Sequence, residues 1–294
     1  MSSLNAEALQ AYSAAGEIVK AVKDGLKARA KTGAGHLELA MFVEDEIVRL
    51  GGRPAFPCNI SVNEIASHST PHRDDPRTFA KGDLAKFDLG AVVDGYIADS
   101  AITIEVESEE HTSLISAAEE ALSDALTVVR PSVSAGEIGR AIETSARKNG
   151  YNVLKGLYGH NLERNCLHGG LTIPAYDDGS RKKVREGDVV AIEPFLTPGN
   201  GEIARAKGGD IFQIVRRNAF LLNEEEKKLL CHIERNYNAF PFARRWLPEP
   251  GALDRLADES IAMEFPVLVE KDRALVAQAE HTIIVGRDGC TIIT

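Results

Sequence analysis

Residues 87–100, FDLGAVVDGYIADS, predict a tight β-hairpin. Apolar and β-prone residues flank a central Asp94-Gly95 pair, which is typical of two-residue hairpin turns. With that turn, Asp88 faces Ala101 across the hairpin, and Asp99 lies two places along on the same face. Diagonal neighbours of this kind have Cα atoms roughly 7 to 8 Å apart. The stretch therefore predicts two carboxylates close together on one face of a sheet, unless an odd-length loop or a bulge separates them.

Two like charges in this arrangement would destabilise the sheet or raise the pKa of a carboxyl group. A cation bound between Asp88 and Asp99 would remove that conflict. The alternative is an edge hairpin whose acidic face is simply solvated. The hairpin by itself leaves both interpretations open.

Composition limits the class of protein. The chain has 294 residues, 44% hydrophobic and 27% charged, which is typical of a globular protein with one large domain or two small ones. A net charge of -10 disfavours a nucleic-acid or anionic-lipid partner. The N-terminal residues lack a signal-peptide pattern, and no apolar run reaches the roughly 20 residues of a membrane span. Four widely spaced cysteines without a C-x-x-C pair are typical of free thiols in a reducing compartment. From the charge, the lack of a membrane span and the free thiols together, we expect a cytoplasmic protein with no DNA or membrane partner.

An order of two helices followed by strands occurs twice along the chain. Helical spacing of apolar residues, capping residues and breakers predict the following segments: helices at 9–26, 36–50, 109–130 and 134–149, a loop at 53–71, β-type segments at 151–174 and 188–197, a helical block at about 219–264, and two final strands around 287–289. We expect an α+β domain of residues 1–294 with internally pseudo-symmetric halves.

Two further acids interrupt apolar strand-like runs. Glu193 closes DVVAIEP, and Glu280 lies within LVAQAEHTIIV. A glutamate in a strand, taken alone, more often lies at a solvated end of the strand than acts as a metal ligand. Together with the two hairpin aspartates, however, these residues indicate a cluster of four carboxylates.

Histidines complete the candidate site. His160 and His168 lie in YGHNLERNCLHGG beside glycines, which permit close backbone approach, and His68 lies in ASHSTP. Each taken alone is more often an ordinary loop histidine. Oxygen ligands combined with imidazole are typical of divalent first-row metals, and bridging carboxylates favour two ions about 3.5 to 4 Å apart.

The ordered set Asp88, Asp99, His160, Glu193 and Glu280, within FDLG, ADSA, GH, IEPF and AEHTIIV, resembles methionine aminopeptidase of type 2. The resemblance extends over essentially the whole chain and is similar to the short archaeal form. It implies the α+β pita-bread fold, with the block at 219–264 as the helical insertion of type 2. It also implies a monomer that removes the initiator methionine from nascent polypeptides and peptides, favouring a small second residue. Contact with the ribosome is left open.

The resemblance also implies a role for each ligand. Asp88 would chelate one metal, Asp99 and Glu280 would bridge both, and His160 with Glu193 would complete the second. Two divalent ions per chain are expected, with Co, Mn, Fe, Ni and Zn all compatible.

Four other residues match substrate-contacting positions of that family. His68 would contact the scissile peptide, and His168 would stabilise the tetrahedral intermediate. Phe56 and Phe265 would line the methionine pocket. Tyr158 departs from the pattern because it is bulkier than the small or amide residue expected there.

Two other functions remain as alternatives. Prolidases and aminopeptidase P share the five ligands and the fold, but they usually carry a substantial N-terminal domain, whereas only 87 residues precede Asp88 here. Non-catalytic pita-bread scaffolds lose ligands, whereas all five are present in this chain.

Overall fold

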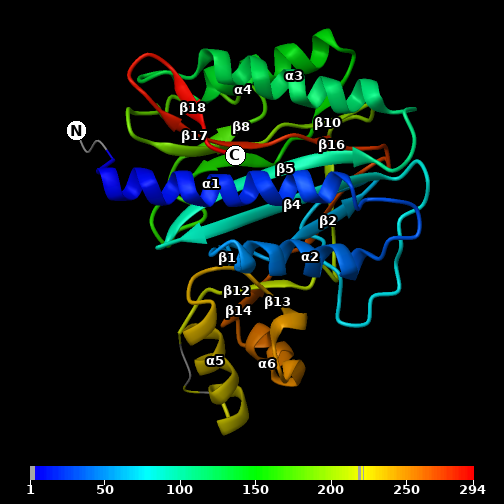
Figure 1. Cartoon of the computed structure of the whole chain (residues 1–294), viewed down its shortest axis with the longest axis vertical. Helices are drawn as coiled ribbons and strands as arrows, with labels where there is room; N and C mark the ends of the chain where they lie inside the picture. Colours follow the sequence, from blue (N-terminus) through cyan, green and yellow to red (C-terminus); the bar gives the residue numbers. More distant parts are fainter. Residues whose placement is uncertain (1–3, 218–219, 221) are drawn as a thin grey trace.

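Two helix pairs, each followed by strands, dominate the architecture of the computed structural model (Figure 1). The structure describes residues 4–217, 220 and 222–294. The helices are α1 (Ala6–Lys27), α2 (His36–Arg49), α3 (Thr112–Val128), α4 (Ala135–Lys148), α5 (Glu224–Asn236) and α6 (Leu253–Asp258). None of these described helices combines the length and apolar character needed to cross a membrane.

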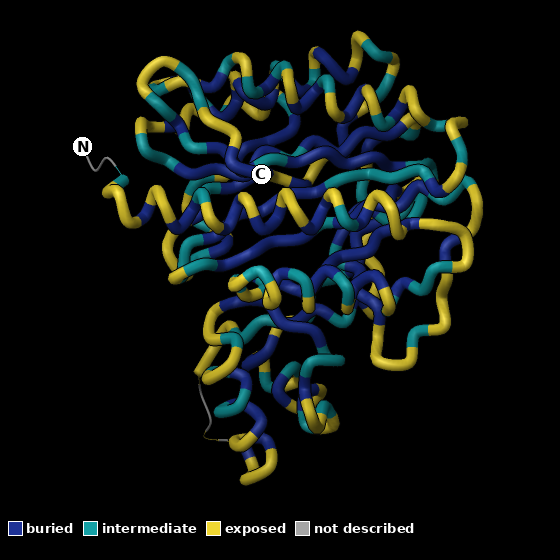
Figure 2. The backbone as a smooth tube through the Cα atoms, viewed as in Figure 1, coloured by how far each residue is buried: buried dark blue, intermediate teal, exposed yellow. Residues whose placement is uncertain are grey.

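Helix α1 lies against the sheet through one apolar stripe. Asn5 caps its first turn by accepting a hydrogen bond from the amide of Ala8 at 2.8 Å. Tyr12, Val19 and Leu26 are buried as their helical spacing predicts, whereas Leu9 is 46% exposed and lies off that stripe. The tube in Figure 2 shows the same division, with exposed outer turns and a buried inner face.

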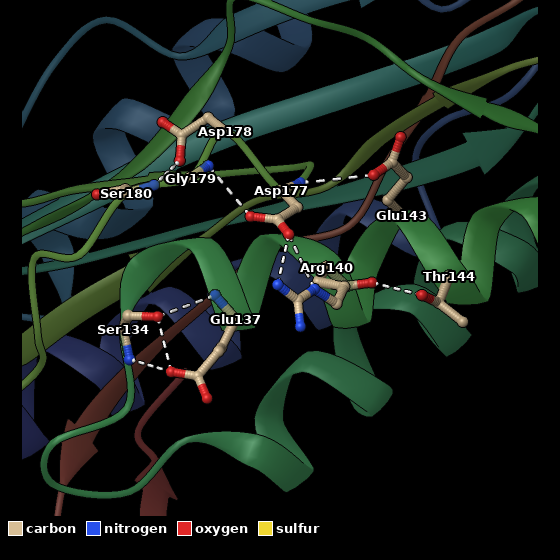
Figure 3. Close-up of polar contacts among 9 residues, drawn as sticks. All are labelled: Ser134, Glu137, Arg140, Glu143, Thr144, Asp177, Asp178, Gly179 and Ser180. Carbon is tan, nitrogen blue, oxygen red and sulfur yellow. Dashed lines mark hydrogen bonds and ion pairs between the residues drawn. The ribbon is translucent and has the colours of Figure 1, made fainter.

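Helices α3 and α4 were predicted at 109–130 and 134–149, and both are present with slightly shorter bounds. Ser134 and Glu137 form a capping box, in which each side chain accepts from the other's backbone amide (Figure 3). Arg140 in the next turn donates to Asp177 at 2.6 Å, which ties α4 to the segment after β8 (Figure 3).

The predicted hairpin is confirmed in both turn and register. Strands β4 (Leu84–Val93) and β5 (Tyr96–Glu105) are joined by Asp94 and Gly95, with φ of 51° and 89°. Positive φ at both central residues is the geometry that favours an Asp-Gly pair. Strand β4 aligns Asp88 with Ala101 of β5, as predicted.

The segment at 53–71 was predicted to be a loop, and this was wrong in part. It contains strands β1 (Arg53–Pro54), β2 (Asn59–Val62) and β3 (Ile65–Ser67). Asn63 adopts a positive φ of 55°, which lets the chain turn between β2 and β3. A loop was expected because prolines and asparagines dominate the composition, although short strands tolerate them at their ends.

The remaining strands form the second half of the molecule and the block below it. They are β6 (Asn152–Val153), β7 (Tyr158–Asn161), β8 (Thr172–Pro174), β9 (Val189–Ile192), β10 (Phe195–Thr197), β11 (Ile203–Ala206), β12 (Ile211–Ile214), β13 (Phe242–Ala243), β14 (Ala262–Glu264), β15 (Val267–Glu270), β16 (Ala277–Gln278), β17 (His281–Val285) and β18 (Cys290–Ile292). Strands β17 and β18 flank the predicted turn at 287–289.

The sheets and helices form two similar halves. In the first half, α1 and α2 pack on the sheet of β1, β4, β2 and β5. In the second half, α3 and α4 cover strands of the sheet ordered β18-β17-β9-β7-β8 and its neighbours β10 and β16 (Figure 1). The repeated order of two helices and a sheet matches the predicted pseudo-symmetry.

A separate block projects from the lower edge of the sheets (Figure 1). It contains α5 and α6 packed with the small sheet of β13, β12 and β14 around a core of its own. Residues 219 and 221, at the start of the predicted helical block, lie outside the described residues. Within the described part the block is only partly helical, because β12 and β14 pair at its base.

Candidate metal centre

Five predicted ligands converge where the two halves meet. One carboxylate oxygen each from Asp88, Asp99 and Glu280 lies within 4.8 Å of the others. The Nε2 atom of His160 lies 3.7 Å from Asp99 Oδ2 and 3.9 Å from Glu193 Oε1. The structure therefore brings together all five of these side chains.

Strand pairing accounts for this convergence. Asp88 and Asp99 lie on one face of the β4–β5 hairpin because Asp88 pairs with Ala101, two residues beyond Asp99. His160 of β7 pairs with Ala191 of β9, two residues before Glu193. Strand β17 begins directly after Glu280, and its first residue pairs with Ile192 of β9. Each half of the molecule thus contributes acids to the same point.

Hydroxyl side chains join β5 to β16 and β17 across the boundary between the halves. Thr282 Oγ1 accepts from the amide of Asp99 at 2.8 Å and donates to the carbonyl of Asp99 at 2.7 Å. Ser100 Oγ donates to the carbonyl of Glu280 at 2.6 Å and accepts from Lys23 Nζ at 2.6 Å. We call Ser100 and Thr282, with Thr103, which makes the equivalent pair of bonds to Gln278, the hydroxyl seam.

The four carboxyl groups are largely buried and repel one another. Burial raises the pKa of Asp88 to about 7. Burial and then the Asp88 charge raise the pKa of Asp99, and burial followed by Asp88 and Asp99 raises that of Glu193. The pKa of Glu280 is raised by burial and by its acidic neighbours, although Lys23 opposes this. Such a cluster is costly unless a cation compensates it.

Unused ligand atoms show that the site fits a divalent metal. Asp88 Oδ1, Asp99 Oδ1 and Glu280 Oε2 are buried and have no hydrogen-bond partner in the described part of the chain. Buried polar atoms are normally paired, so these oxygens are available to coordinate a metal ion. Carboxylate oxygens with one imidazole form a donor set that suits Mn, Fe, Co, Ni or Zn.

The five predicted ligands line a cavity of about 290 Å³. All nine predicted site residues line it: Phe56, His68, Asp88, Asp99, His160, His168, Glu193, Phe265 and Glu280. The rings of His160 and His168 meet edge to face at a centroid distance of 4.5 Å. Burial lowers the pKa of His68 to about 4 and also lowers that of His168, so both imidazoles are neutral at pH 7.

Aromatic side chains form part of the apolar wall. Phe56 is 7% exposed and packs over Gly90 of β4, where an added Cβ would lie 2.7 Å from its ring. Phe265 packs edge to face on His68 at a centroid distance of 5.2 Å. Tyr158 also lines the cavity and is 39% exposed, which places this bulky residue toward solvent.

Several groups in the cavity or beside it were not predicted from the sequence. Gln278 Nε2 approaches Asp88 Oδ2 at 3.5 Å, and Asn59 of β2 pairs directly with Asp88. The position of Gln278, two residues before Glu280 on a strand, was a signal that could have found it. No comparable signal marks Ile211 and Pro241, which reach the cavity from beside the projecting block.

Polar contacts fasten the block to α2 and to the segment that follows β3. Arg245 donates to Thr70 Oγ1 at 2.8 Å and to the carbonyl of Pro71 at 3.1 Å, and its guanidinium also pairs with Glu44. Trp246 Nε1 donates to the same glutamate at 2.8 Å. These contacts hold α2 and the segment directly after His68 against the block.

The fold and this acid-rich cavity together define a metal-dependent hydrolase. Residues 10–227 match the profile of metallopeptidase family M24. A methionine aminopeptidase of Thermococcus onnurineus is 43% identical over 288 residues, which cover 95% of this chain and 97% of that protein. The chain therefore belongs to metallopeptidase family M24.

Solved structures agree on the fold. A thermophilic Arx1 superposes with a TM-score of 0.85 at 18% identity, covering 99% of this chain and 91% of that chain. Methionine aminopeptidase of Thermotoga maritima superposes with a TM-score of 0.73 at 22% identity, covering 99% and 97%. The predicted α+β pita-bread fold is confirmed.

Proposed function

We propose that this chain is a methionine aminopeptidase of type 2, which removes the initiator methionine from nascent polypeptides and peptides. The observation that carries the proposal is the convergence of five ligands in a cavity that also contains two neutral histidines and two phenylalanines. Family membership supports metal-dependent peptide hydrolysis.

In this proposal two divalent ions would be held by Asp88, Asp99, His160, Glu193 and Glu280, and Asp99 and Glu280 would be shared between them. When bound, such metals act as Lewis acids that activate a water molecule and polarise the scissile carbonyl. The unpartnered oxygens of Asp88, Asp99 and Glu280 support this assignment, because they are available to coordinate metal.

His68 orients the scissile peptide. Its Nδ1 lies 3.2 Å from the carbonyl oxygen of Pro266, which can only accept, so Nδ1 carries the proton. In a neutral ring this leaves Nε2 as an acceptor for a substrate N–H. The ring is held in this orientation by its contact with Phe265.

His168 stabilises the oxygen of the tetrahedral intermediate by donating a hydrogen bond to it. Its edge-to-face contact with His160 supports this role, because it keeps the imidazole next to the ligands without making it one. Phe56 and Phe265 form apolar walls for the unbranched, polarizable methionine side chain. Every group in this scheme comes from one chain, which supports a monomer as the active form.

Peptide hydrolysis with added metal tests the proposal. Release of methionine from Met-Ala-Ser supports it, and Asp99→Ala or Glu280→Ala should abolish turnover and lower bound metal. Full activity in either variant would contradict the bridging role. Cleavage only before proline would indicate a prolidase-like enzyme, and metal binding without turnover would indicate a scaffold.

A further inference from the structure

Lys86 is a lysine with no exposed surface near the start of β4. Its Nζ donates to three backbone carbonyls, those of Asn63 at 2.9 Å, Leu84 at 3.2 Å and Val276 at 2.8 Å. Among the described residues, no carboxylate forms an ion pair with it. Fully buried lysines without a paired acid are rare, so this arrangement needs a reason.

The three carbonyls belong to three segments that lead to the cavity. Asn63 forms the turn into β3, which ends immediately before His68. Leu84 begins β4, in which Lys86 and Asp88 lie on the same face two residues apart. Val276 precedes β16, the short strand that leads to Glu280. Lys86 is therefore a single point of contact between the segments that carry three site residues.

Neighbouring bonds make this junction rigid. The amide of Val276 donates to the carbonyl of Asn63 at 3.1 Å, so that oxygen accepts two bonds. The side chain of Asn63 donates to Asp83 at 3.0 Å and accepts from the amide of Leu84 at 2.9 Å. The ammonium of Lys86 fills the remaining acceptor positions, and its three N–H groups match the three carbonyls in number.

We propose that Lys86 is a positioning residue, whose ammonium fills a cage of three backbone carbonyls and thereby sets the positions of His68, Asp88 and Glu280. Three carbonyl oxygens in this arrangement would also suit a small monovalent cation. In this chain the ammonium group of Lys86 takes the place of such a cation. The inference rests on the proposed function only in assigning metal to Asp88 and Glu280.

Two substitutions at Lys86 distinguish the effect of its hydrogen bonds to the three carbonyls from the effect of burying its apolar stem. Lys86→Met keeps the apolar stem but supplies no donor, so the carbonyls lose their partner and the three segments are no longer held together. We expect Mn²⁺ affinity, measured by calorimetry at pH 7, to fall about 10- to 100-fold, as is typical when a group that orients metal ligands is removed. Lys86→Ala empties the cage and should weaken Mn²⁺ binding at least as much.

Ammonium ion should restore the Ala variant but not the Met variant, whose side chain still fills the space. In ammonium chloride, Lys86→Ala should regain at least tenfold in Mn²⁺ affinity, and the Tm of the metal-free variant should rise. Tetramethylammonium chloride at equal ionic strength should do neither, because that ion is too large. Lys271→Ala removes an exposed lysine near the same segment and should respond to neither salt.

Parent-like Mn²⁺ affinity in Lys86→Met would overturn the positioning role. An Ala variant that ammonium leaves unchanged, or that stays unfolded at every ammonium concentration, would overturn the cage. The Tm of the metal-free protein tests the cage without reference to turnover. A parent protein that binds no metal would therefore contradict the proposed function while the cage stays testable.

Discussion

Thr282 Oγ1 donates a hydrogen bond to the carbonyl of Asp99 and accepts one from its amide. One hydroxyl group thus connects β17 to β5 through two hydrogen bonds. The side chain is fully buried, and the amide of Thr282 is itself bonded to Thr294 Oγ1 at 3.1 Å. Because Thr282 lies two residues after Glu280, it sets the distance between the two proposed bridging carboxylates.

Thr282→Val should weaken metal binding while leaving the fold intact. Valine has nearly the same shape but leaves the amide and carbonyl of Asp99 unpaired, which should cost about 1 to 3 kcal/mol in stability. We expect a 10- to 100-fold loss of metal affinity by calorimetry. Thr282→Ser retains the hydroxyl and is the matched control. Equal affinity in the Val and parent proteins would show that the seam does not position Asp99.

His168→Ala should impair catalysis and leave bound metal nearly unchanged. Loss of one donor to a developing oxyanion typically lowers kcat by on the order of 10² or more. Steady-state kinetics on Met-Ala-Ser, together with metal analysis of the same preparation, provides the measurement. Loss of one metal equivalent would instead identify His168 as a ligand.

Phe56→Ala should reduce selectivity for methionine without affecting the nucleophile. We expect kcat/KM for Met-Ala-Ser to fall by one to two orders of magnitude, consistent with roughly 1.4 to 3 kcal/mol of lost apolar contact. Bound metal should not change. Phe42→Ala, which removes a ring packed under Arg29 outside the cavity, is the control and should retain parent kinetics. If Phe56→Ala cleaves this peptide as well as the parent does, the pocket assignment is wrong.

His36 should make the protein acid-sensitive independently of the metal centre. Its side chain is 5% exposed, its ring packs on Phe79 at a centroid distance of 4.3 Å, and neither ring nitrogen has a hydrogen-bond partner among the residues that the structure describes. Burial, and then the nearby Arg77 charge, lowers the pKa of His36 below its ordinary value of 6.5. Below pH 6.5 the unfolded chain therefore takes up a proton that the folded chain does not, so stability falls as pH falls.

The test compares urea unfolding at pH 7.5 and pH 5 at saturating metal. His36→Phe keeps the aromatic packing and removes the titrating group, so it should lose less stability than the parent between these two pH values. His72→Phe, at an exposed position, should behave like the parent. An unchanged pH dependence in His36→Phe would refute the role of His36.

The hairpin and its acids were predictable because their signals are local. An Asp-Gly turn sets the register, and a register sets which side chains share a face. Glu193 and Glu280 could be recognised because each interrupts an apolar run. Their partners across the sheet could not, since the pairing of residue 160 with 191 and of residue 192 with 281 depends on tertiary packing that no local pattern specifies.

Groups that act through the backbone were the least predictable. The carbonyls around Lys86 carry no side-chain identity, so a sequence cannot indicate that residues 63, 84 and 276 meet there. The two strands between residues 59 and 67 were missed for a related reason. Asparagine at 63 is typical of a loop, and only the positive φ of the folded chain shows that it connects strands.

The hydroxyl seam also determines when, during synthesis, the site can exist. Ribosomes make the chain from its N-terminus, so β5 with Asp99, Ser100 and Thr103 emerges long before its partners near residue 280. Once residue 193 has been made, four of the five proposed ligands are present. Glu280 is still missing, and so are the groups near residue 280 that bond to β5 through the hydroxyl seam. Long-range contacts of this kind form late in folding. Assembly of the proposed metal site therefore requires synthesis through β17, and a truncation before Glu280 removes a proposed ligand together with the strand that bonds to Asp99.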